Sequence, residues 1–132
     1  MSLKLALTIL RVVTPALFMV HSITRITLGT IGQFGVFMES RGFPNGAAWV
    51  WAITITELVA GTAIIVGYRV RWMVVPLFII AATGIVLIHG GLGWFVGEFG
   101  SGGSEYSVAL MVMLVVLGAA DLDRQRELQP RP

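Results

Sequence analysis

Residues 47–67, AAWVWAITITELVAGTAIIVG, form an apolar stretch in which the only charged residue is Glu57. This length falls within the roughly 17–25 residues that a helix needs to cross a bilayer core. Inside lipid, every backbone N–H and C=O group must find its partner within its own segment, so a helix is the expected conformation. Three similar apolar stretches lie on either side, at about residues 3–31, 72–89 and 104–120.

The composition of the chain agrees with a membrane location. Of its 132 residues, 56% are hydrophobic and only 12% are charged, and the mean hydropathy is +0.87. A soluble domain carries roughly 25% charged residues, so most of this surface is expected to face lipid. The sequence therefore predicts an all-α integral membrane protein. Its single four-helix bundle would span residues 1–120, and residues 121–132 would form a polar cytoplasmic tail.

The distribution of basic residues predicts the orientation of the bundle. Arg41 is in a loop on one side, and the other side carries Lys4, Arg69, Arg71, Arg124, Arg126 and Arg131. By the positive-inside rule, both termini are expected in the cytoplasm. We expect the protein to be a multi-pass protein of the inner (cytoplasmic) membrane. These residues are too scattered to track a nucleic acid, so the expected partners are the lipid bilayer and other membrane or peripheral subunits.

Two charged residues lie deep in the first two apolar stretches. With a rise of about 1.5 Å per residue, Arg11 is roughly 12 Å from Leu3, and Glu57 is roughly 15 Å from Gly67. At these heights Arg11 and Glu57 are predicted to form a structural ion pair that fixes the packing of the two helices. A proton-transfer or ligand-binding role is the alternative, because ionisable residues inside a membrane are commonly functional.

A second polar group is predicted near the outer face, beneath the glycine-rich segment 90–103. His21 and Arg25 are four residues apart and therefore share one side of a helix. The full group comprises His21, Arg25, His89, Glu105 and Tyr106. These side chains would either bind a planar, partly polar ligand that enters from the membrane or form a hydrogen-bonded network that closes the bundle.

The order of several short motifs resembles that of a known family. They are Arg11, His21 with Arg25, Gly42-Phe43-Pro44, Glu57-Leu58-x-x-Gly61, His89-Gly90-x-x-Gly93-x-Phe95 and Glu105-Tyr106-Ser107. From about Leu7 to Leu117, the chain resembles the DoxX family of four-helix membrane proteins. DoxX-like and DoxD-like proteins are linked to membrane oxidoreductases, including a thiosulfate:quinone oxidoreductase, and to redox-stress complexes.

This resemblance implies a membrane subunit of a redox complex with a quinone as its cofactor. The residues His21, Arg25, His89, Glu105 and Tyr106 would then bind the quinone, and histidine suits proton transfer because its pKa is near neutrality. The chain has no cysteine to hold an iron–sulfur cluster, so an organic electron carrier is the simplest choice. A non-catalytic anchor or accessory subunit is the main alternative. A haem or metal protein that uses His21 and His89 is a further one. Whether the chain is itself an enzyme stays open.

Overall fold

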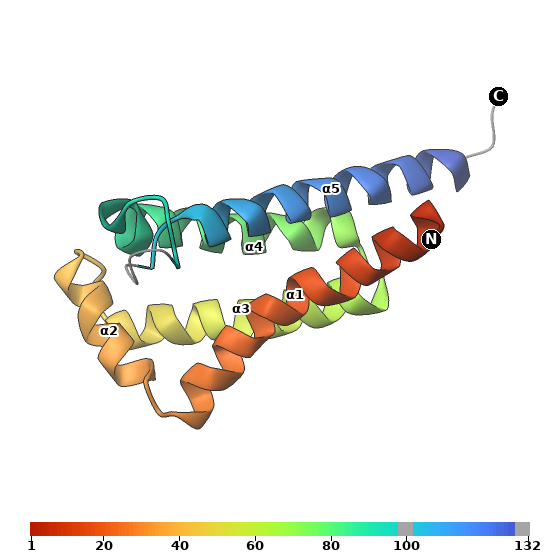
Figure 1. Cartoon of the computed structure of the whole chain (residues 1–132). Coiled ribbons are helices and arrows are strands. Elements are labelled where there is room, and N and C mark those ends of the chain that lie inside the picture. Colours follow the sequence, from red (N-terminus) through yellow and green to blue (C-terminus); the bar gives the residue numbers. More distant parts are fainter. Residues whose placement is uncertain (98–101, 129–132) are drawn as a thin grey trace.

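The computed structural model of the protein describes residues 1–97 and 102–128 and contains four helical segments long and apolar enough to cross a membrane (Figure 1). Three of these segments are the helices α1 (Leu3–Thr27), α3 (Gly46–Val66) and α5 (Glu105–Leu128), and the fourth, Val70–Leu92, begins with α4 (Val70–Gly84). A π-helical turn, η1 (Ile85–His89), and a 3₁₀ turn, η2 (Gly90–Leu92), extend α4, and a shorter helix, α2 (Ile31–Ser40), joins α1 to α3. The predicted all-helical protein with four membrane-spanning segments is therefore confirmed within the described residues.

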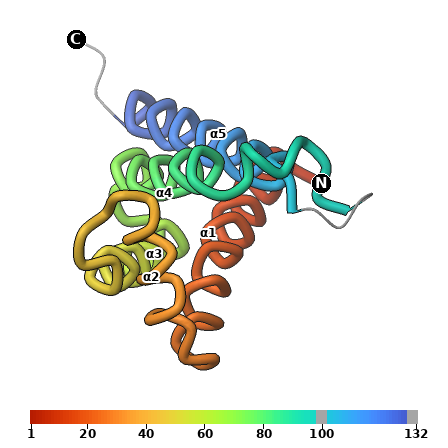
Figure 2. The backbone as a smooth tube through the Cα atoms, turned by 90° about the vertical axis from the view of Figure 1, so that its left-hand side faces the viewer, coloured from red at the N-terminus to blue at the C-terminus, as the bar shows by residue number. Residues whose placement is uncertain are grey.

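The helices are arranged so that the start of α1 and the last turns of α5 lie at the same end of the bundle (Figure 1). Helix α3 packs against α1, α2 and α4, and α5 packs against α4 and α1. Figure 2 shows that the last turns of α1 lead away from α4 and α5 toward α2. The turn between α3 and α4 lies at this same end, whereas α2, η2 and the start of α5 lie at the opposite end. That the termini face the cytoplasm stays a prediction.

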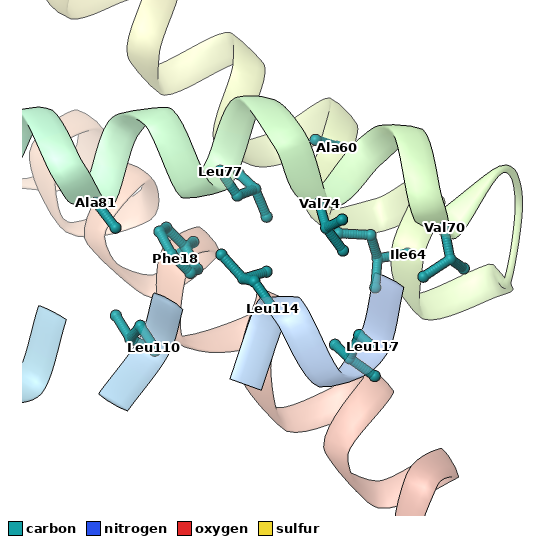
Figure 3. Close-up of a cluster of buried hydrophobic side chains, with 10 residues drawn as sticks. All are labelled: Phe18, Ala60, Ile64, Val70, Val74, Leu77, Ala81, Leu110, Leu114 and Leu117. Carbon is teal, nitrogen blue, oxygen red and sulfur yellow. The ribbon is translucent and has the colours of Figure 1, made fainter. Parts of the chain in front are cut away.

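The core is formed where α1, α3, α4 and α5 meet (Figure 3). Phe18 of α1, Leu77 of α4 and Leu114 of α5 are almost fully buried there. Large apolar side chains such as Val59 and Val86 are instead exposed on the outside of the bundle. This distribution is expected where the surrounding solvent is lipid, since exposed apolar groups meet hydrocarbon there instead of water.

Helix α2 lies mostly between the first two apolar stretches, in a part of the chain for which the sequence predicted no helix. The helix packs tightly on the start of α3, where a Cβ atom at Gly46 would lie only 1.9 Å from the carbonyl oxygen of Gly35. Glu39 also accepts a hydrogen bond from the backbone N–H of Gly46 at 3.0 Å. Two glycines therefore let the backbones approach, which stabilises a helix that its own glycine content disfavours.

The last helix is longer than predicted and includes most of the expected polar tail. Helix α5 continues through residues 121–128, whereas residues 129–132 lie outside the described part of the chain. The buried carboxylate of Asp121 accepts a hydrogen bond from the backbone N–H of Arg71 at 3.2 Å, which attaches this part of α5 to α4. The pair Asp123–Arg126 is three residues apart on the same helix face and supports the extension.

Candidate functional site

A buried ion pair joins α1 to α3. Arg25 Nη2 donates to Glu57 Oε2, and the two side chains are only 13% and 5% exposed. Ser22 Oγ donates to the same carboxylate oxygen at 2.6 Å and lies 3.2 Å from the carbonyl oxygen of Thr54. The carboxylate of Glu57 therefore has two donors from α1, which offsets the cost of burying its charge.

The sequence predicted Arg11 as the partner of Glu57, and this prediction was wrong, because Glu57 pairs with Arg25. Arg11 would reach Glu57 only if Leu3 and Gly67 lay at the same height, but the guanidinium of Arg11 lies against Gly67, at the end of α3. Helix α1 therefore begins about two turns, roughly 12 Å, beyond the end of α3. At that position Arg11 is close to the negative end of the α3 dipole, where a cation is favoured. Its Nε atom is buried and has no hydrogen-bond partner within the described residues.

His21 and Tyr106 bring α1 and α5 together beside this pair. Their ring centroids are 6.3 Å apart, and the rings meet edge to face at 61°. Tyr106 is 39% exposed, and His21 is also exposed. Arg25 Nε donates to the backbone carbonyl of His21 at 3.3 Å, so the guanidinium lies next to the histidine on the same helix. Within the described residues, the ring nitrogens of His21 form no hydrogen bond.

His89 ends the π-helical turn η1 and holds the segment that leads to α5. Its Nδ1 lies 2.7 Å from the carbonyl oxygen of Gly102. A carbonyl oxygen only accepts hydrogen bonds, so Nδ1 must carry the proton and Nε2 is left for another partner. Single π-helical turns frequently occur at functional sites, and this one sets the direction in which the imidazole leaves the helix.

Glu105 forms hydrogen bonds with the same segment. Its Oε1 accepts a hydrogen bond from the backbone N–H of Val96 at 3.0 Å. The backbone N–H of Glu105 donates to the carbonyl of Trp94 at 3.0 Å, and that of Gly103 donates to the carbonyl of Phe95 at 3.2 Å. As the first residue of α5, Glu105 also places its carboxylate at the positive end of the helix dipole. Glu105 therefore anchors the described part of the loop to α5.

The structure divides the predicted residues into two groups. His21 contacts Tyr106 and Arg25 pairs with Glu57, whereas His89 and Glu105 bind the backbone of the loop segment. His89 is nevertheless close enough to His21 to interact with it electrostatically. Ser22 was not singled out from the sequence, although a small polar residue three positions before Arg25 on an apolar helix is a usable signal. The described residues contain no group of three or more His, Asp or Glu side chains suited to hold a metal ion.

The family model DoxX matches residues 6–90, which is more than half of the chain. No protein of curated function and no solved structure matches. The matched region contains Arg11, His21, Arg25, Glu57 and His89, all of which carried the resemblance noted from the sequence. The chain belongs to the DoxX family.

Proposed function

We propose that this DoxX protein is a quinone-interacting membrane subunit of a redox complex and that His21 and Tyr106 contact the quinone. The observation that carries the proposal is the edge contact between these two exposed polar rings on different membrane-spanning helices. Polar side chains in a membrane span are costly unless a partner satisfies them, so an exposed pair of this kind favours a bound ligand.

The donor groups suit a quinone. A quinone head group is flat, so it can pack against aromatic rings, and its two carbonyl oxygens accept hydrogen bonds. The phenolic O–H of Tyr106 and a ring N–H of His21 are donors of the required kind. Arg25 adds a third, because its buried Nη1 has no hydrogen-bond partner within the described residues. Glu57 and Ser22 hold the other side of this arrangement in place.

Each residue has a defined part in the proposed chemistry. A bound quinone would supply the capacity to take up two electrons and two protons in the membrane. His21 would hold or release a proton at a ring nitrogen, which an imidazole does readily near neutral pH. Tyr106 and Arg25 would orient the carbonyl oxygens by donating hydrogen bonds. A redox protein of the same complex would deliver or receive the electrons.

Quinone retention by the purified protein tests the proposal. The full chain is isolated in mild detergent, its lipids are extracted, and quinones are quantified by mass spectrometry per mole of protein. The wild type is expected to retain quinone. Tyr106→Phe, which removes one hydroxyl, is expected to lower retention about fivefold, as loss of one hydrogen bond of about 1 kcal/mol implies. His21→Ala should lower it further.

The control variant changes a neighbouring residue of α1. Thr24→Val removes an exposed hydroxyl from the same helix, one that forms no side-chain hydrogen bond within the described residues, and it should leave retention unchanged. Stoichiometric co-purifying proteins without quinone, together with no effect of His21→Ala on the activity of those proteins, would overturn the proposal and identify the chain as an anchor.

A further inference from the structure

The end of the bundle at which α1 starts and α5 ends has an open hollow of about 310 Å³. It lies between the start of α4 and the extended part of α5, and its lining residues are Arg69, Arg71, Trp72, Asp121 and Gln125. His21 is near the end of α1 and Tyr106 is at the start of α5, and these parts of the two helices lie at the opposite end of the bundle (Figure 1). The hollow is therefore separate from the proposed quinone site. Its volume is at the lower end of the range of about 300–1,000 Å³ that is typical of small-ligand sites.

Two arginines of the hollow have free donor groups. The guanidinium of Arg69 lies over the ring of Tyr68 at 5.7 Å, and that of Arg71 lies over the ring of Trp72 at 5.4 Å. Such a cation–π contact does not use the N–H donors of the guanidinium, which remain available to a ligand. Neither arginine forms a salt bridge with a carboxylate in residues 1–97 or 102–128. Such planar, multidentate donors suit phosphate oxygens.

The acidic residue of the hollow is already engaged. Asp121 Oδ2 accepts a hydrogen bond from the backbone N–H of Arg71, and its Oδ1 lies 3.9 Å from Nε of Arg124. The carboxylate thus binds the first turn of α4, where the helix dipole favours a negative charge. With the charge of Asp121 offset in this way, the two unpaired guanidinium groups leave the hollow electropositive.

The neighbouring aromatic side chains place the hollow at the height of the lipid head groups. Tyr68 and Trp72 are 60% and 57% exposed at the junction of α3 and α4. Exposed tyrosine and tryptophan at the ends of membrane-spanning helices are typical of the membrane–water interface. Basic pockets between such helices bind anionic head groups. We propose that this hollow binds the phosphate of an anionic phospholipid through Arg69 and Arg71.

Lipid selectivity measures the proposed binding directly. The full chain is reconstituted in phosphatidylcholine vesicles that contain spin-labelled phosphatidylglycerol or spin-labelled phosphatidylcholine, and electron paramagnetic resonance gives the relative association constant of each label. The wild type is expected to prefer phosphatidylglycerol. In the double variant Arg69→Gln/Arg71→Gln, this preference should fall by roughly fivefold for each arginine removed. Circular dichroism checks that the helical content is unchanged.

The control variant removes the same charge from the same end of the bundle. Lys4→Gln/Arg126→Gln changes two exposed basic residues outside the hollow and should keep the preference. An equal fall in both variants would overturn the site, because it would show that diffuse surface charge attracts the lipid. Displacement of the spin-labelled phosphatidylglycerol by equimolar soluble glycerol phosphate would also overturn it, in favour of a free phosphate ester.

A second substitution keeps the test decisive if the glutamine variant does not insert into vesicles. Arg69→Lys/Arg71→Lys retains both charges but loses the planar fork of the guanidinium group. A lower preference for phosphatidylglycerol in this variant supports a site that recognises phosphate by hydrogen-bond geometry. A preference equal to that of the wild type would overturn such a site.

Discussion

Arg25 of α1 and Glu57 of α3 form a buried ion pair that joins two membrane-spanning helices across 32 residues of chain. Ser22 completes the contact by donating to the same carboxylate oxygen. Because few polar partners exist elsewhere in an apolar bundle, this contact fixes the register of α1 against α3. It also holds Arg25 beside His21 and therefore positions the proposed quinone site.

Breaking this ion pair should destabilise the protein strongly. Glu57→Leu leaves the guanidinium of Arg25 buried without its carboxylate, and the expected loss is about 3–5 kcal/mol in the free energy of unfolding. Chemical unfolding in detergent, followed by circular dichroism, measures this loss.

The double variant Arg25→Leu/Glu57→Leu separates the pair from its surroundings. Replacing both charges with apolar side chains should recover most of the lost stability, because no unpaired charge remains. Ser22 would still have the carbonyl oxygen of Thr54 as an acceptor. If the two single losses simply add in the double variant, the ion pair does not couple the helices.

Two glycines of α2 should respond in opposite ways to alanine. At Gly35 a Cβ atom would lie 2.7 Å from the backbone nitrogen of Ala47, so Gly35→Ala should push α2 away from α3 and cost about 1–3 kcal/mol. A Cβ atom at Gly32 would meet no atom of the described residues within 4 Å beyond its chain neighbours and its own helix backbone, so Gly32→Ala should stabilise the helix by about 0.5–1 kcal/mol. Thermal unfolding of the two variants in the same detergent compares them. Equal effects would refute the close packing of α2 on α3.

Glu105 should protect the backbone N–H of Val96 from exchange with solvent. In Glu105→Ala this N–H loses a charged acceptor, a contact of about 1.5–3 kcal/mol, so its hydrogen exchange should accelerate at least about tenfold. Glu105→Gln keeps an acceptor oxygen and should retain much of the protection. Hydrogen exchange followed by mass spectrometry on peptides covering residues 94–97 measures the rate. Unchanged exchange in the alanine variant would show that the carboxylate does not anchor the loop.

The orientation in the membrane is testable with reporter fusions. The excess of basic residues at the end that contains the termini predicts that the C-terminus faces the cytoplasm. A reporter that is active only in the cytoplasm should therefore be active when fused to the C-terminus and inactive when inserted at Asn45. The reverse pattern would contradict the predicted orientation.

The membrane-spanning segments were predictable because lipid imposes a simple requirement. Each span must be a helix with few charges, and the four apolar stretches of the sequence meet this requirement. Helix α2 was not predictable in the same way. Gly32 and Gly35 suggest a break in the helix, whereas in the structure Gly35 provides the flat surface against which α3 packs.

The candidate site was only partly predictable for a related reason. The spacing of His21 and Arg25 places them on one side of α1, and Glu57 was recognised as unusual in its span. Which charges meet depends on how far one helix is shifted along the next, and hydropathy gives no information on that shift. An offset of about two turns was enough to exchange Arg11 for Arg25 as the partner of Glu57.

The sequence separation within the ion pair has a consequence for biosynthesis. Arg25 leaves the ribosome 32 residues before Glu57, and at about 5–20 residues per second this interval lasts about 2–6 s. During that time α1 carries an uncompensated arginine, which opposes its transfer from the translocon into lipid. The first span is thus expected to wait at the translocon until α3 emerges, so that the two segments enter the bilayer as a neutral pair.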